Sequence, residues 1–146
     1  MSSPEQLGFI GLGNMGGAIA LRLLRAGFPL TVFDLQREKM LPLVREGATE
    51  AASPAEVAQR STIAIASLQA GDVEEVALGK QGIDKAPKPA PLFIDLSSTA
   101  PELAVTVASS LSRRGIEMLD SPVSGADIGA TNGNLTLFVG GSYEAF

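Results

Sequence analysis

A glycine-rich turn between an apolar run and an amphipathic segment constrains the fold of this chain more than any other feature. Residues 7–11 form a short apolar run that ends in glycine, which predicts a buried strand. Over residues 14–26 the apolar side chains recur at helical spacing, which predicts a helix that ends at Gly27. The turn and the start of the helix comprise Gly11, Leu12, Gly13, Asn14, Met15 and Gly16. A strand, a glycine-rich turn and a helix in this order are typical of the first half of a βαβ unit.

Strands and helices alternate along the rest of the chain. Apolar runs predict further strands at residues 29–33, 48–50, 62–66, 91–96, 116–119 and 135–139. Helical patterns, with capping boxes that begin at Ser53 and Thr99, predict helices at residues 36–46, from 53 onward, at 72–78 and at 99–114, and a last helical turn from Ser142. Residues 79–91 and 120–134 are rich in turn-forming residues and are predicted to be loops. The alternation predicts one α/β domain over residues 1–146, a doubly wound and mostly parallel sheet with helices on both faces.

Composition excludes several classes of function. The 146 residues are 45% apolar and 18% charged, which suits a folded domain and not a disordered tail or a coiled coil. The net charge is −5 and no basic stripe is visible, so nucleic acid and anionic membranes are not expected partners. The absence of cysteine and histidine excludes disulfides, Cys/His zinc sites and histidine-based catalytic triads, and we expect no metal site. Neither a signal peptide nor a membrane-spanning run is visible, so we expect a cytoplasmic protein.

The glycine pattern indicates a site for a dinucleotide. Gly11 permits a sharp turn, Gly13 lets the backbone approach a diphosphate without a β-carbon in the way, and Gly16 lets the helix pack close to the strand. The amide groups and the dipole at the start of the helix favour an anion there. Glycines also occur in purely structural turns, but the flanking strand and helix favour the binding interpretation.

Asp34 follows the strand predicted at residues 29–33 and favours NAD over NADP. A carboxylate at this position accepts hydrogen bonds from the adenosine ribose and repels a 2′-phosphate. Arg37 weakens the preference, because its guanidinium would pair with such a phosphate, so NADP stays possible; the other interpretation of Arg37 is a solvated residue at a helix start. An S-adenosylmethionine site also combines a glycine turn with an acidic residue after the second strand, but with a tighter glycine spacing than this one.

Several motifs resemble those of one enzyme family. Residues 8–16 resemble the start of the β-hydroxyacid dehydrogenase family, which includes 3-hydroxyisobutyrate, tartronate-semialdehyde and 6-phosphogluconate dehydrogenases. Pyrroline-carboxylate reductases open with a similar string, so a second motif decides. Residues 120–126, followed by glycines at 129 and 133, resemble the family's substrate loop. Residues 95–98 resemble its segment beside the nicotinamide, and residues 67–69 fall where the family has a Leu-Pro pair against the cofactor.

The resemblance implies an NAD(P)-dependent oxidoreductase that transfers hydride between the nicotinamide and a small β-hydroxy acid or semialdehyde. It implies that the cofactor contacts residues 11–16, Asp34, Leu68 and Ser98, and that the substrate carboxylate contacts Ser124, Gly125 and Ala126. A serine hydroxyl and glycine amides suit a carboxylate, because they bind an anion without adding charge.

Three residues depart from the family pattern. Ser98 replaces a threonine and keeps a hydroxyl group, and Gln69 replaces a proline and would leave its loop less rigid. Ala126 replaces the second glycine of the substrate loop, and its methyl group would narrow the substrate site or change which acid fits.

The family's proton-transfer lysine, with an asparagine nearby, comes from an all-helical second domain that this chain does not contain. The only lysines here are Lys39, Lys80, Lys85 and Lys88, and none lies in a family motif, so we assign no catalytic residue. The chain resembles the cofactor half of a two-domain enzyme that is a homo-oligomer at full length, and we expect an uncovered apolar face. The alternatives are a non-catalytic NAD-binding module, and a reductase of a short glyoxylate-like aldehyde or of an imine.

Overall fold

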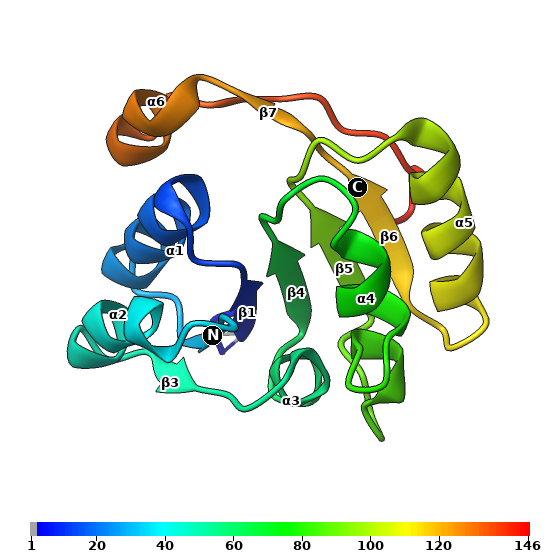
Figure 1. Cartoon of the computed structure of the whole chain (residues 1–146), viewed down its shortest axis with the longest axis horizontal. Coiled ribbons are helices and arrows are strands. Elements are labelled where there is room, and N and C mark those ends of the chain that lie inside the picture. The colour runs from blue at the N-terminus through cyan, green and yellow to red at the C-terminus, as the bar shows by residue number, and fades with distance from the viewer. Residues whose placement is uncertain (1–2) are drawn as a thin grey trace.

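Six short apolar runs form one parallel sheet. A computed structural model of the chain describes residues 3–146. The strands are β1 (Leu7–Ile10), β2 (Leu30–Phe33), β3 (Thr49–Glu50), β4 (Ile63–Ala66), β5 (Leu92–Asp95) and β6 (Glu117–Asp120). Their order in the sheet is β3-β2-β1-β4-β5-β6 (Figure 1). The order reverses between β1 and β4, which is where ligands bind in doubly wound sheets, and the predicted fold class is confirmed.

Both faces of the sheet are covered, as runs without polar alternation require. One apolar cluster joins β1 and β2 to α1 (Asn14–Arg25) and α2 (Leu41–Arg45). The other joins the sheet to α3 (Pro54–Gln59), α4 (Val73–Leu78) and α5 (Pro101–Ser112). Within β1 the fully buried Phe9 belongs to the first cluster and its neighbour Ile10 to the second. Among residues 3–146, no helix has the length and hydropathy needed to cross a bilayer.

The capping predictions are confirmed at one helix and wrong at another. The Ser53 hydroxyl accepts a hydrogen bond from the Glu56 N–H at 3.1 Å, at the start of α3. At α5 the N-cap residue is Ala100, and no side chain caps it. The hydroxyl of Thr99 is unavailable because it donates to the buried carboxylate of Asp95 at 2.6 Å.

Four other predictions need correction. The helix predicted at 36–46 is divided into the 3₁₀ turn η1 (Arg37–Lys39) and α2, because Pro42 is tolerated only in the first turn of a helix. The loop predicted at 79–91 contains the 3₁₀ turn η2 (Ile83–Lys85). The loop predicted at 120–134 contains β7 (Val123–Ser124) and α6 (Ala126–Asn132). The strand predicted at 135–139 is only β8 (Thr136–Leu137), which pairs antiparallel with β7 outside the main sheet.

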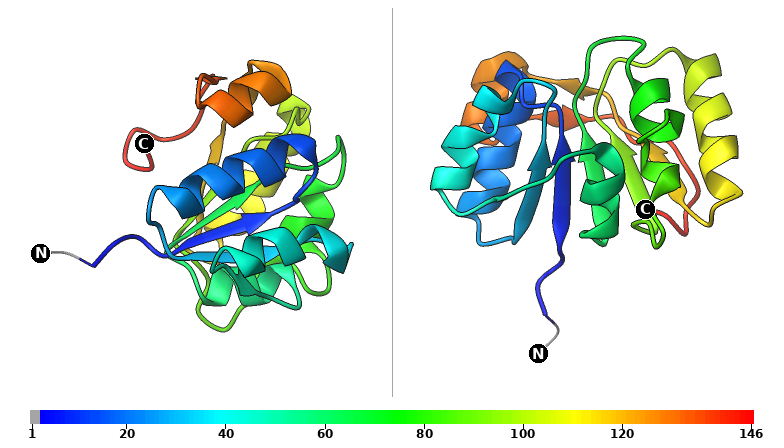
Figure 2. Two further views of the ribbon diagram at one scale, coloured as in Figure 1. Left: turned by 90° about the vertical axis from the view of Figure 1, so that its left-hand side faces the viewer. Right: turned by 60° about the horizontal axis from the view of Figure 1, so that its bottom comes forward.

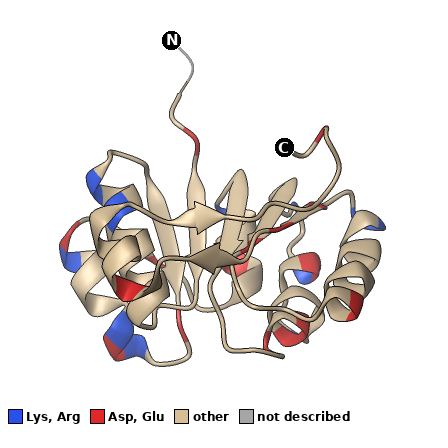
Figure 3. Ribbon diagram, turned by 90° about the horizontal axis from the view of Figure 1, so that it is seen from above, with Lys and Arg blue, Asp and Glu red and all other residues tan. Residues whose placement is uncertain are grey.

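Residues 121–140, which we call the flap, leave and rejoin the sheet at the end of β6. The flap begins and ends at two backbone hydrogen bonds between Asp120 and Gly140, of 2.9 and 2.7 Å. Its helix α6 lies against α1 (Figure 2), where Arg22 Nη1 donates to the carbonyl oxygen of Thr131 at 3.0 Å. Asp127 is the flap's only charged residue, and the hairpin strands β7 and β8 are tan, the colour of residues without charge, in the view from above (Figure 3). After the flap, residues 143–145 form a single turn, in which Ser142 Oγ accepts from the Ala145 N–H at 3.1 Å.

Candidate functional site

The glycine-rich turn has two glycines that the fold requires and one that it does not. Gly11 has φ +89°, a left-handed conformation that favours glycine. A β-carbon on Gly16 would collide with the carbonyl oxygen of Gly11, so α1 packs this close only because residue 16 has no side chain. Gly13 has an ordinary extended backbone (φ −65°, ψ −168°), and a β-carbon there would meet no protein atom within 4 Å. The space beside Gly13 is therefore open to a ligand.

Asp34 joins this turn to the end of β2. Its Oδ2 accepts a hydrogen bond from the Leu12 N–H at 2.8 Å, and its Oδ1 accepts one from the Gln36 N–H at 2.8 Å. Each carboxylate oxygen keeps a further lone pair for a ligand hydroxyl. The carboxylate thus holds two loops together at the carboxyl end of the sheet and remains able to bind a sugar.

A cavity of about 580 Å³ opens over the turn. The predicted cofactor residues on its wall are Gly11, Gly13, Asn14, Met15, Gly16, Asp34 and Leu68. Leu12 and Ser98 are not on the wall: Leu12 is buried and contributes its backbone N–H to Asp34, and Ser98 is exposed directly after the buried Ser97. The structure therefore brings together seven of the nine predicted residues.

Sequence reasoning missed the wall formed by the start of the following helices. The cavity is also lined by Pro54 of α3, by Glu75 and Val76 of α4, and by Asp72, the N-cap residue of α4. Lys39, which falls within the helix predicted at residues 36–46, also lines it. The signal was available, because helices that follow β3 and β4 begin at the same edge of the sheet as the glycine turn. With Asp34, the charged side chains on the wall are three carboxylates and one ammonium group.

A chain of hydrogen bonds links β5 to the loop after β4. The Leu68 N–H donates to Ser97 Oγ at 2.8 Å, and the Ser97 N–H donates to Asp95 Oδ1 at 3.0 Å. Asp95 is fully buried, and its other oxygen accepts from Thr99. Ser97 therefore positions the cavity wall at Leu68.

Asp120 lies beside Asp95 on the neighbouring strand, in register. Its Oδ1 is buried, as is the hydroxyl of Ser121, and neither atom has a hydrogen-bond partner among the described residues. Burial, and then the negative charge of Asp95, raise the pKa of the Asp120 carboxyl above its ordinary value.

The predicted substrate residues Ser124, Gly125 and Ala126 are exposed on the flap, and none is on the cavity wall. Gly125 has φ +137° and Ala126 has φ +51°. Ala126 is the only residue other than glycine with a positive φ between residues 3 and 146. The methyl group that replaces the family's glycine therefore sits where the backbone suits glycine better.

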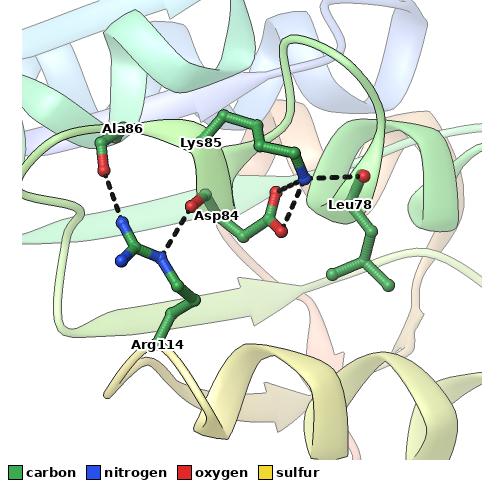
Figure 4. Close-up of polar contacts among 5 residues, drawn as sticks. All are labelled: Leu78, Asp84, Lys85, Ala86 and Arg114. Carbon is green, nitrogen blue, oxygen red and sulfur yellow. Dashed lines mark hydrogen bonds and ion pairs between the residues drawn. The ribbon is translucent and has the colours of Figure 1, made fainter.

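Lys85 makes its contacts away from the cavity. Lys85 Nζ donates to the carbonyl oxygen of Leu78 at 3.0 Å and pairs with Asp84 (Figure 4). Arg114 donates to the carbonyl oxygens of Asp84 and Ala86, both at 2.9 Å, which fixes η2 against the end of α5. These residues precede β5 and β6, so they lie near the amino ends of the strands, away from the glycine turn. Lys85 has a structural role there.

Comparisons with known proteins agree with this geometry. Residues 6–146 match the family described as the NAD binding domain of 6-phosphogluconate dehydrogenase. The 3-hydroxyisobutyrate dehydrogenase of Pseudomonas aeruginosa is 43% identical over 141 residues, which are 96% of this chain and 47% of that protein. A Mycobacterium tuberculosis 3-hydroxyisobutyrate dehydrogenase solved with L-serine has a TM-score of 0.88 at 29% identity, over 98% of this chain and 48% of that one.

A second similar structure contains a cofactor. Psf3 in complex with NADP+ and 2-OPP has a TM-score of 0.87 at 31% identity and covers 95% of this chain and 50% of its own. The chain therefore spans about half the length of the relatives it matches. With all but the first five residues matched, the chain belongs to the 6-phosphogluconate dehydrogenase family of NAD-binding domains.

Proposed function

We propose that the protein is an NAD-dependent oxidoreductase of the β-hydroxyacid dehydrogenase type, which transfers hydride between the nicotinamide and a small β-hydroxy acid or the matching semialdehyde. The observation that carries the proposal is the open space beside Gly13, which belongs to a cavity with Asp34 on its wall. The names of the relatives support the reaction class.

The residues present fit a dinucleotide. A cavity of about 580 Å³ lies within the usual range for a cofactor site. The backbone at residues 11–16 holds the diphosphate at the start of α1, and Asp34 accepts the ribose hydroxyls. Leu68, fixed by Ser97, offers an apolar surface to the nicotinamide end. When bound, the cofactor supplies the hydride donor or acceptor.

The flap is the proposed site of the substrate carboxylate. Ser124 and the backbone around Gly125 offer a hydroxyl and amide groups, which bind an anion without a permanent charge. Packing of α6 on α1, with Arg22 bonded to Thr131, ties the flap to the helix that holds the diphosphate. Ser98, exposed at the end of β5, faces the same edge of the sheet and is proposed to contact the cofactor.

Oxidation of an alcohol also needs a proton acceptor, which we do not assign to this chain. We propose that the complete protein has a helical domain that supplies it and that the complete protein is a homo-oligomer. Exposed apolar side chains support a covered face on the flap and the segment after it: Ile128, Leu137, Phe138, Val139, Tyr143 and Phe146.

The test uses the complete protein. Titration with NADH, followed by fluorescence, should show saturable binding at micromolar concentrations. Turnover is then measured with 3-hydroxyisobutyrate, L-serine and other short hydroxy acids, and in reverse with short aldehydes and a cyclic imine. A protein that binds no NADH at millimolar concentration refutes the proposal. Binding without turnover on any of these substrates supports a non-catalytic NAD-binding module instead.

A further inference from the structure

We propose that Glu50 is a specificity-determining residue, which favours NAD over NADP by holding Arg37 in an ion pair away from the position of a 2′-phosphate. The inference rests on the proposed dinucleotide site and adds to it a residue outside the cavity.

The cation that would recognise NADP is already present. Arg37 follows Asp34 by three residues, in the turn that Asp34 closes through the Gln36 N–H. A 2′-phosphate on a ribose bound at Asp34 would therefore come to the same turn. An arginine near this place is the usual partner of that phosphate, because its guanidinium binds two oxygens at once.

In the structure that guanidinium has another partner. Arg37 Nε lies 2.7 Å from Glu50 Oε1, and Nη2 lies 3.2 Å from Oε2, so the pair is bidentate. The hydrogen bond and the opposite charge raise the pKa of Arg37, and the hydrogen bond with Arg37 lowers the pKa of Glu50. The fork that would hold a phosphate holds a carboxylate instead.

The position of Glu50 is set by the sheet. Glu50 lies on the edge strand β3, opposite Val32 of β2, and the next residue, Ala51, donates its N–H to the Val32 carbonyl oxygen at 2.9 Å. Arg37 is held by less, since 70% of its side chain is exposed. When Glu50 loses its charge, Arg37 is free to turn toward the ribose.

The charges on the cavity wall increase the effect that the Arg37–Glu50 pair has on the binding of a 2′-phosphate. The charged residues on the wall are three acids, Asp34, Asp72 and Glu75, and one base, Lys39. A 2′-phosphate adds up to two negative charges to this environment. A released Arg37 would be a second cation next to the phosphate, with little consequence for NAD, which has no group at that position.

The test is a comparison of dissociation constants for NADPH and NADH, measured by cofactor fluorescence on the complete protein at low ionic strength. The variants are E50Q, which keeps the shape of the side chain, and the double variant R37Q/E50Q. Arg25 and Glu46 form a matched control, since they make the same exposed bidentate pair, at 3.2 and 2.8 Å, between α1 and the end of α2. The E46Q variant removes the same charge without touching Arg37.

We expect E50Q to bind NADPH about three- to tenfold more tightly, and NADH within about twofold of the unmodified protein, a range set by the modest strength of exposed ion pairs. R37Q/E50Q and E46Q should not show the gain. An unchanged NADPH constant in E50Q, a gain that survives in R37Q/E50Q, or an equal gain in E46Q would each overturn the inference. If the unmodified protein does not bind NADH, the dinucleotide site itself is refuted, and this outcome is known before any variant is compared.

Discussion

Replacement of Gly13 by alanine should weaken cofactor binding strongly and leave the fold intact. The backbone at Gly13 has φ −65° and ψ −168°, which alanine adopts without strain, and the new β-carbon would have no protein atom within 4 Å. Alanine is a weaker N-cap than glycine, but it also reduces the entropy of the unfolded chain. These effects oppose each other, so the free energy of unfolding should change by less than about 0.5 kcal/mol.

The effect on binding is much larger, because the methyl group occupies the space through which a diphosphate approaches the N–H groups at the start of α1. Loss of one hydrogen bond to a charged group costs about 1.5–3 kcal/mol. The dissociation constant for NADH should therefore rise by about 10- to 150-fold.

Two measurements on the same samples separate the effects: NADH titration by fluorescence, and thermal unfolding without cofactor. Gly17→Ala is the control, since Gly17 lies one residue beyond the turn, is absent from the cavity wall, and would bring its β-carbon 3.3 Å from the Leu12 carbonyl oxygen. It should bind NADH normally. If Gly13→Ala binds NADH as tightly as the unmodified protein, the diphosphate does not rest on this turn and the reasoning is wrong.

Three further substitutions test the glycine turn, the buried carboxyl of Asp120 and the flap. Gly16→Ala should destabilise the fold by about 1–3 kcal/mol in urea unfolding, because its β-carbon meets the Gly11 carbonyl oxygen; an unchanged midpoint would contradict the packing. Asp120→Asn should increase stability at neutral pH, because the raised pKa of Asp120 means that the folded state holds the proton more tightly than the unfolded state does. The unmodified protein should lose stability as the pH rises from the ordinary aspartate pKa through the raised one, and the variant should not. Parallel pH profiles of the two proteins in thermal unfolding would exclude this. Ala126→Gly removes the strain of an alanine with positive φ but increases the conformational entropy of the unfolded chain by a similar amount, so the free energy of unfolding should change by less than about 1 kcal/mol. The ratio of kcat/KM for a bulkier hydroxy acid to kcat/KM for a small one should rise. An unchanged ratio would show that Ala126 does not limit substrate size.

The parallel sheet and the glycine turn were predictable because their signals are local. A strand covered on both faces must be a continuous apolar run, as residues 7–10 and 63–66 are. The Ser53 box also acts over three residues only. Where a side chain has a distant partner, the same local pattern fails. Thr99 fits a capping box as well as Ser53 does, but the buried carboxylate of Asp95 takes its hydroxyl. Pro101, a typical first residue of a helix, was the better local signal, because α5 starts at Pro101 with Ala100 as its N-cap.

The flap was not predictable as a helix because its stability comes from outside. Residues 126–132 include a glycine, an asparagine and a threonine, all weak helix formers. The helix forms against α1, with Gly129 and Ala130 buried and Arg22 bonded to the Thr131 carbonyl oxygen near its end. Arg22 lies more than a hundred residues earlier in the chain, so no local pattern contains this contact.

The candidate site has the same division between local and distant information. The sequence places Asp34 at the end of a strand, but only the sheet order shows which residues surround it. Because β3 lies beyond β2, and Glu50 is opposite Val32, the carboxylate reaches the turn after Asp34 and pairs with Arg37. Arg37, the residue for which the sequence left NADP possible, is thus paired with Glu50, and only the strand register reveals this partner. The proposed role of Glu50 thus makes cofactor preference depend on the pairing of an edge strand of two residues, and not on the acidic residue at the end of β2 alone.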